Sequence, residues 1–191
     1  MPTATTEFGL VLPANWLTLD VTGSRRINDE VEELLRQGAL TDEAFRTHRG
    51  RIEKQLRAVV RSLRVESVAM AAVMISIQND ILPLFASMTA AIVDGRLEDY
   101  RGRPDAQISL EELPGVGPVV RQRFIDTSTD AQTGVTMPAA VFQYLIPMPG
   151  QQRRLILTFV SPDTEPVLLS AFEELFAAVA GSVSFQNQQG R

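Results

Sequence analysis

Apolar positions near the N-terminus recur at helical spacing. Ile27, Val31 and Leu34 fall on one stripe of a helix that ends at Gly38, and a second helix, which opens at Thr41, has a stripe from Phe45 to Leu63. Only a short loop separates the two. We therefore expect an antiparallel helical hairpin over about residues 25–64.

The middle of the chain is apolar at both odd and even positions. Residues 65–77 and 81–93 form two such segments, separated by Asn79 and Asp80, which favour a turn. A strand with apolar residues of both parities is buried on both faces. These segments are therefore predicted to form a strand pair covered on both sides.

The last third of the chain has a clear strand rhythm. Residues 116–125, 135–146 and 154–160 read as three strands separated by polar turns, which predicts a β-meander. An amphipathic helix follows, opening at Ser161-Pro162-Asp163 and ending at Gly181.

Shorter extended segments are expected at the two ends of the chain. Residues 8–12 and 16–20 read as two strands with a bend at Pro13, and Val183 with Phe185 reads as a closing strand.

These elements predict one α+β domain over residues 1–191. Strands buried on both faces require a cover on each, so we expect a central antiparallel sheet of about six to seven strands with helices on both faces. This is an αβα sandwich with an N-terminal helical hairpin; the meander and the C-terminal helix occupy about residues 116–185. The alternative is an open two-layer α+β fold in which one face of the apolar strand pair meets a partner subunit.

The order of strands and turns in the C-terminal half resembles a known family. The run Tyr144-Leu145-Ile146-Pro147, a turn, Arg154-Leu155-Ile156-Leu157-Thr158-Phe159, Ser161-Pro162-Asp163 and a helix closing on Ala180-Gly181-Ser182-Val183 resembles the end of PsbP/Mog-like domains. Phe8 through Trp16 is similar to their opening strand pair. The resemblance, strongest over residues 116–185, extends to DcrB/LpqN-like and type VI effector-chaperone-like domains. It implies an αβα sandwich and a protein that works by binding.

The composition excludes several kinds of site. The 191 residues contain no cysteine, one histidine (His48) and one lysine (Lys54). Disulfides, zinc fingers, iron–sulfur clusters and multi-histidine metal sites are therefore excluded, and we expect no cofactor. The formal net charge of -5 disfavours a dedicated nucleic-acid binder.

The sequence also gives an expectation about where in the cell the protein acts. The first residues lack a basic segment followed by an apolar core, and the apolar halves of residues 65–93 are too short to cross a bilayer. We expect a cytoplasmic protein without a transmembrane segment.

Four basic residues in the second predicted helix form a candidate partner-binding surface. Lys54, Arg57, Arg61 and Arg64 are spaced three, four and three apart, which aligns them as one basic ridge. Such a ridge can bind an acidic partner, a phosphate backbone or an anionic membrane surface. The alternative is a solvated face paired with the acidic residues between Asp29 and Glu33.

A short glycine motif suggests a second function. Leu113-Pro114-Gly115-Val116-Gly117-Pro118 resembles the hairpin of helix-hairpin-helix DNA-binding modules, whose glycine amides and following helix grip a phosphate. That hypothesis requires a helix at residues 119–125. The competing interpretation is a glycine-proline turn that enters a strand.

Other chemistry-bearing residues favour structural roles. His48 falls on or beside the apolar stripe of its helix, which favours packing over catalysis. Met70, Met74 and Met88 suit either core filling or an adaptable binding face. Neighbouring acids, such as Glu111-Glu112 and Glu173-Glu174, point in different directions when helical, although carboxylates from distant segments could still meet.

The sequence therefore favours a non-enzymatic, chaperone-like or adaptor-like protein-binding module, and the resemblance to PsbP/Mog-like domains implies a secretion-related or membrane-associated partner. It favours a protein partner over nucleic acid and leaves a homodimer open. A nucleic-acid module using Leu113 to Pro118 is the alternative, and an enzyme using spatially assembled carboxylates ranks third.

Overall fold

Strands dominate the computed structural model. It describes residues 6–21, 27–39, 50, 53, 56–57, 68–76, 84–129, 136–161 and 164–187. The elements are β1 (Thr6–Gly9), β2 (Trp16–Leu19), α1 (Ile27–Ala39), β3 (Val68–Ser76), β4 (Leu84–Asp94), the 3₁₀ turn η1 (Leu97–Asp99), β5 (Gln107–Leu113), β6 (Gly117–Thr129), β7 (Thr136–Pro147), β8 (Arg153–Ser161), α3 (Pro166–Gly181) and β9 (Ser184–Asn187).

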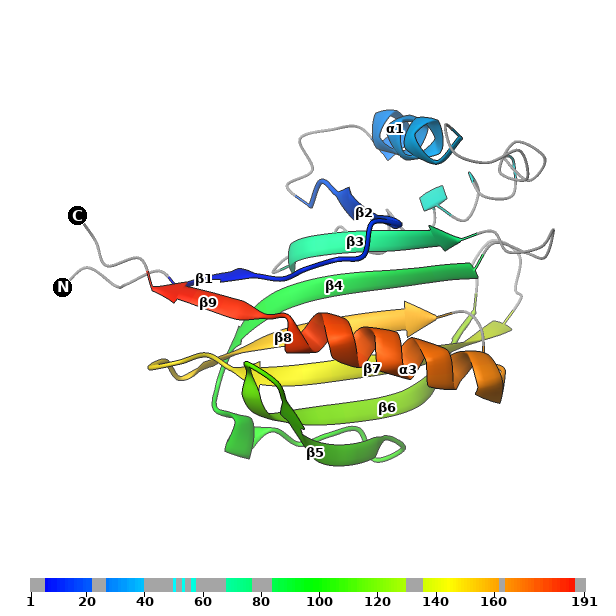
Figure 1. Cartoon of the computed structure of the whole chain (residues 1–191). Coiled ribbons are helices and arrows are strands. Elements are labelled where there is room, and N and C mark those ends of the chain that lie inside the picture. The colour runs from blue at the N-terminus through cyan, green and yellow to red at the C-terminus, as the bar shows by residue number, and fades with distance from the viewer. Residues whose placement is uncertain are drawn as a thin grey trace.

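The main sheet of the described chain has seven antiparallel strands in the order β2-β3-β4-β8-β7-β6-β5 (Figure 1). The three strands predicted over residues 116–160 are β6, β7 and β8, and they form the expected meander. Buried and more exposed residues alternate along these strands. In β8, for example, every second residue from Leu155 to Ser161 is buried.

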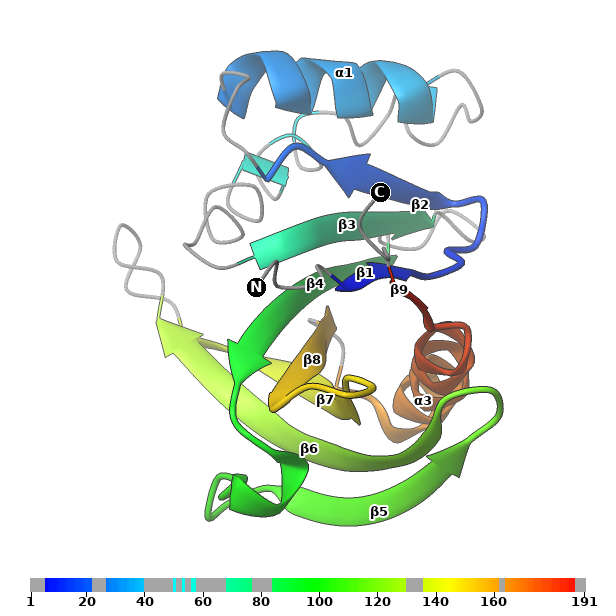
Figure 2. The same cartoon turned by 90° about the vertical axis from the view of Figure 1, so that its left-hand side faces the viewer.

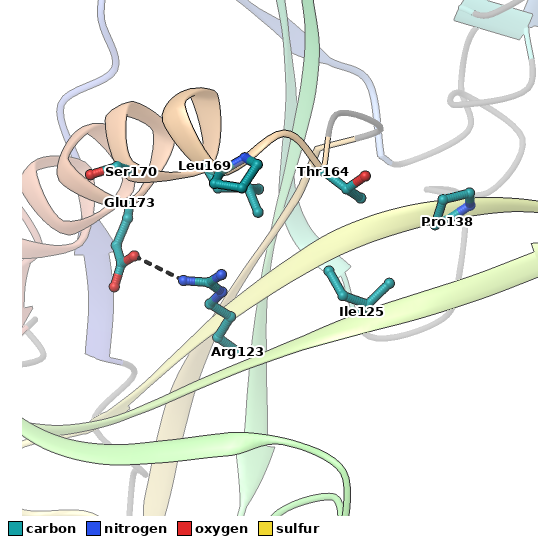
Figure 3. Close-up of a pocket in the computed structure, with 8 residues that line it drawn as sticks. Arg123, Ile125, Pro138, Thr164, Leu169, Ser170 and Glu173 are labelled. Carbon is teal, nitrogen blue, oxygen red and sulfur yellow. Dashed lines mark hydrogen bonds and ion pairs between the residues drawn. The ribbon is translucent and has the colours of Figure 1, made fainter.

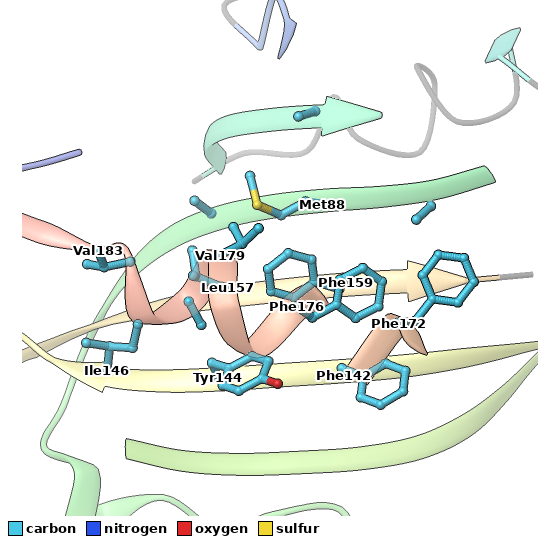
Figure 4. Packing of buried hydrophobic residues seen from close by; sticks show 14 of the residues in the cluster. Met88, Phe142, Tyr144, Ile146, Leu157, Phe159, Phe172, Phe176, Val179 and Val183 are labelled. Carbon is cyan, nitrogen blue, oxygen red and sulfur yellow. The ribbon is translucent and has the colours of Figure 1, made fainter. Parts of the chain in front are cut away.

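Helix α3 covers one face of the sheet through an aromatic cluster (Figure 4). Phe176 stacks on Phe159 of β8, with ring centroids 4.5 Å apart, and on Phe172 one helical turn earlier, at 5.4 Å. Phe142 and Trp16 meet Phe176 edge to face at 5.4 and 6.4 Å. These rings join α3 to the edge strand β2 and to the inner strands β8 and β7.

The same face is lined by small and sulfur-containing residues on the earlier strands. Met74 and Met88 are buried there, whereas Met70 is half-buried at the margin of the core. Of the two interpretations of these methionines, core filling is therefore the one that agrees with the structure.

The two ends of the described chain pair with each other. β1 and β9 form a separate two-stranded antiparallel sheet, with Phe8 opposite Phe185 (Figure 1). Ser182 reinforces this junction by accepting a hydrogen bond from the Val11 amide at 2.9 Å.

The predicted αβα sandwich is wrong, because the described chain is mostly β and helices do not cover both faces of its sheet. α3 lies on one side of the curved sheet, whereas α1 lies beyond the β2 edge (Figure 2). The segment from Gly95 to Ala106, with its single 3₁₀ turn, packs on the opposite face. Its contacts are with Ile108 of β5 and Gln122 of β6, so an irregular segment, and not a helix, covers the opposite face at that end of the sheet.

The N-terminal helical hairpin predicted over residues 25–64 is likewise not present in the described chain. Its first helix corresponds to α1, with Val31, Leu34 and Leu35 buried. Most of the second predicted helix lies outside the described residues. Among the described residues, no helix is long and apolar enough to span a membrane.

The aromatic cluster gives a stability prediction. Replacing Phe176 by Ala should lower the free energy of unfolding by about 3–5 kcal/mol, because it removes a buried ring from four aromatic contacts and leaves a cavity. Urea denaturation followed by circular dichroism measures the change. Val167→Ala, at a position of the same helix that is 76% exposed, is the control and should change stability by less than about 0.5 kcal/mol. Equal effects of the two substitutions would contradict the packing described here.

Candidate functional site

Strand β6 turns two arginines toward the face that α3 covers. The register places Arg121 opposite Tyr144 and Arg123 opposite Phe142, and both partners are core residues. The Arg123 guanidinium lies 5.7 Å from the centre of the Phe142 ring. Both arginine side chains are partly buried on this face, so their charges need partners.

Helix α3 and strand β5 supply the partners. Glu173 of α3 accepts hydrogen bonds from both arginines: Oε1 from Arg121, and Oε2 from Arg123 at 3.3 Å. Arg121 also forms an ion pair with Glu111 of β5, with 2.8 Å between Nε and Oε1. The result is a chain of alternating charges, Glu111, Arg121, Glu173 and Arg123, that ties α3 to one end of the sheet.

Tyr144 lies buried beside this charged chain. Burial raises the pKa of its phenol to about 12, an effect that the nearby positive charge of Arg121 only partly opposes. Its hydroxyl has no hydrogen-bond partner of acceptable geometry among the described residues. Tyr144 is therefore a neutral core residue at physiological pH.

A pocket of about 610 Å³ opens at the far end of the charged chain, beside the first turns of α3 (Figure 3). Its apolar wall comes from Leu169 and Pro166 of α3 and from Ile125 and Pro138 of the neighbouring strands, and Thr164, Ser170, Arg123 and Glu173 add polar groups. Ile125 is 44% exposed, so part of the apolar wall is open to solvent.

The chemistry of this pocket suits binding. Arg123 has five N–H donors and its NH1 is bound to Glu173, which leaves other donors for a ligand acceptor such as a carbonyl or carboxylate. The carboxylate that lines the pocket already accepts hydrogen bonds from two arginines. Among the described residues, no group of three or more acids or histidines could hold a metal ion.

The opposite face of the sheet carries a second polar array. Gln122 donates a hydrogen bond to Gln143, which donates one to Thr158 Oγ1 at 3.0 Å, across β6, β7 and β8. The Arg103 amide binds Gln122 Oε1 at 3.4 Å from the covering segment. Since Gln122 is only 2% exposed, we assign this array to holding the cover in place.

The predicted basic ridge lies mostly outside the described residues. This is true of Lys54, Arg61 and Arg64, and also of His48. Arg57 is described: its guanidinium forms an ion pair with Glu53 and donates a hydrogen bond to Asn28 of α1. The one described member of the ridge is therefore engaged within the chain.

The glycine motif forms a β-hairpin. β5 ends at Leu113 and β6 begins at Gly117, with positive φ angles of 78° at Gly115 and 93° at Gly117 that glycine adopts without strain. Residues 119–125 are a strand, so the helix that the DNA-binding alternative requires is absent. The hairpin tip instead lies against the end of α3, where Pro114 approaches Gly181.

Carboxylates from distant segments do meet, as Glu111 and Glu173 show, but an arginine lies between them. The adjacent acids Glu112 and Glu174 are exposed. The sequence analysis missed the pair Arg121 and Arg123 as site residues. Their separation of two within a predicted strand was the available signal, because it places both on one face.

Comparison with protein-family models and with curated proteins finds no match for this chain.

The shifted pKa of Tyr144 gives a pH prediction. In the unfolded chain the phenol titrates near its ordinary value of 10, whereas in the folded protein it stays protonated to about pH 12. The stability that this group contributes is therefore complete below pH 10 and is lost as the pH rises from 10 to 12, by at most about 1.4 kcal/mol per pH unit.

Urea denaturation of the wild type and of Tyr144→Phe between pH 8 and pH 11.5 tests this expectation. The difference in unfolding free energy should be constant up to about pH 10 and then shift in favour of the variant. Tyr100 is present in both proteins, so its own titration cancels. A difference that stays constant throughout would contradict a buried, neutral phenol.

Proposed function

We propose that this chain is a non-enzymatic protein-binding module of the adaptor or chaperone type, acting in the cytoplasm in a secretion-related role. The resemblance of residues 116–185 to PsbP/Mog-like domains supports this class of function, although the αβα sandwich that the resemblance also implied is wrong. The observation that carries the proposal is the pocket beside α3, which combines an apolar wall with an arginine that retains free donors.

The partner that fits this pocket is an apolar peptide segment of another protein. Apolar side chains of the peptide would pack on Ile125, Leu169 and the two prolines, and a backbone carbonyl or a carboxylate would accept a hydrogen bond from Arg123. Val167, which is 76% exposed on the first turn of α3, extends the apolar surface next to the pocket.

The described acids support binding over catalysis. Glu173, the carboxylate of the pocket, is held by Arg121 and Arg123, and Glu111 is held by Arg121. A general acid or base must be within hydrogen-bond reach of its substrate, and these carboxylates are already bound to arginines.

Selection from a random peptide library tests the proposal. Peptides selected on the wild-type protein should be rich in apolar residues, and Ile125→Asp should weaken their binding at least about tenfold, because it places a charge on the apolar wall. Arg123→Gln should weaken peptide binding by a smaller factor. Fluorescence anisotropy of a labelled peptide measures both changes.

Val11→Asp is the matched control, because Val11 is 71% exposed and is not part of the pocket wall. It should leave peptide affinity unchanged. A library that yields no binding peptide, or peptides that bind equally well to Ile125→Asp, would overturn the proposal.

A further inference from the structure

Strand β5 is an open edge of the seven-stranded sheet, and two of its exposed side chains, Ile108 and Leu110, are large and apolar. Its inner side pairs with β6 in an unbroken register from Gln107 to Leu113. No other described strand pairs with its outer side, and the one backbone hydrogen bond that a described turn or loop forms to β5 is that of the hairpin turn, from the Val116 amide to the Leu113 carbonyl. The opposite edge strand, β2, is only four residues long.

Two large apolar side chains of this edge are exposed on the sheet face opposite α3. Leu110 is 73% exposed, and Ile108, whose Cδ1 end lies against Gly102, is 51% exposed. Edge strands are usually protected from pairing by charged residues, especially lysine, by proline or by a bulge. β5 contains no lysine or proline, and no register shift interrupts it. Of its two glutamates, Glu111 is paired with Arg121 within the chain.

We propose that β5 pairs with β5 of a second copy of this chain, in antiparallel orientation about a two-fold axis perpendicular to the sheet. The pairing joins two seven-stranded sheets edge to edge. The backbone groups of both outer edges then find partners, and the exposed apolar side chains are covered.

The positions of the side chains select the register. The two-fold axis keeps each face of the sheet on its own side, so only residues of equal parity can lie opposite each other. With Ser109 on the axis, Ile108 faces Leu110 of the second copy, and Leu110 faces its Ile108. Four apolar side chains then form one cluster, because cross-strand neighbours lie close together.

The neighbouring registers are less favourable. An axis at Leu110 places Ile108 opposite a glutamate, Glu112 of the second copy. An axis at Glu111 brings the two Glu111 carboxylates together, and like charges opposite each other destabilise a strand pair. In the register with Ser109 on the axis, Gln107 lies opposite Glu111 of the second copy, a compatible amide and carboxylate pair.

The size of the contact sets the expected affinity. A pair of seven-residue strands with four apolar side chains buries less than the about 1,200–2,000 Å² of a stable complex. The dimer is therefore in reversible exchange with the monomer, and it forms as concentration rises.

Sedimentation velocity over about 1 μM to 1 mM tests the association, because weak complexes dissociate within this range. The wild type should shift from monomer to dimer. Leu110→Asp should weaken dimerisation at least about tenfold, because it places charges within the apolar cluster. Val167→Asp, at a position equally exposed on α3, should not. A wild type that stays monomeric, or a dimer that Leu110→Asp does not affect, would overturn the proposal.

Cysteine substitution tests the register, because the chain has no cysteine of its own. Opposite residues of an antiparallel pair have Cα atoms about 4.5–5.5 Å apart, within the range of a disulfide. Ser109→Cys should therefore form a covalent dimer on mild oxidation.

Gln107→Cys is the matched control on the same face of β5. In the proposed register it lies four residues from its own symmetry mate, roughly 14 Å along the strand, so it should not crosslink. Crosslinking of Gln107→Cys to the same extent, or of Leu110→Cys in preference to Ser109→Cys, would overturn the register.

Discussion

The packing of one helix on one sheet holds this fold together. α3 inserts Phe172 and Phe176 among the rings of Phe142, Phe159 and Trp16, which come from three different strands. Aromatic pairs in stacked and edge-to-face geometry stabilise more than their buried area alone would. Because the rings interlock, α3 can take only one position along the sheet, and the position of the pocket follows from it.

Ion pairs connect α3 to the sheet where the apolar packing ends. Toward β5 and β6 the surface beneath α3 becomes polar, and Glu173 of the helix lies between two arginines of the sheet. A partly buried ion pair adds little net stability but penalises every arrangement that separates its members. The charged chain therefore fixes the rotation of α3 at this end, and it leaves Arg123 beside the pocket with donors to spare.

Alternation of apolar residues made the meander of β6, β7 and β8 predictable, and the stripe of the last helix made α3 predictable. The fold class was not predictable. Apolar residues at both odd and even positions of β3 and β4 show that both faces of these strands are covered, but they do not show which elements cover them. β5 was missed because Gln107, Ser109 and two glutamates dilute its pattern. The charged chain depends on Glu173 meeting Arg121 from 52 residues earlier, and no local pattern encodes such a contact.

The pairing of β1 with β9 bears on how the chain reaches this structure. Joining Phe8 to Phe185 closes a loop that contains every other described element, and the entropic cost of closing a loop grows with its length. During synthesis on a ribosome, β1 is made before all the other described elements, and β9 is made after them. We therefore expect the seven-stranded sheet to assemble while β1 is still unpaired. The small sheet of β1 and β9 then forms last and joins the two ends of the described chain.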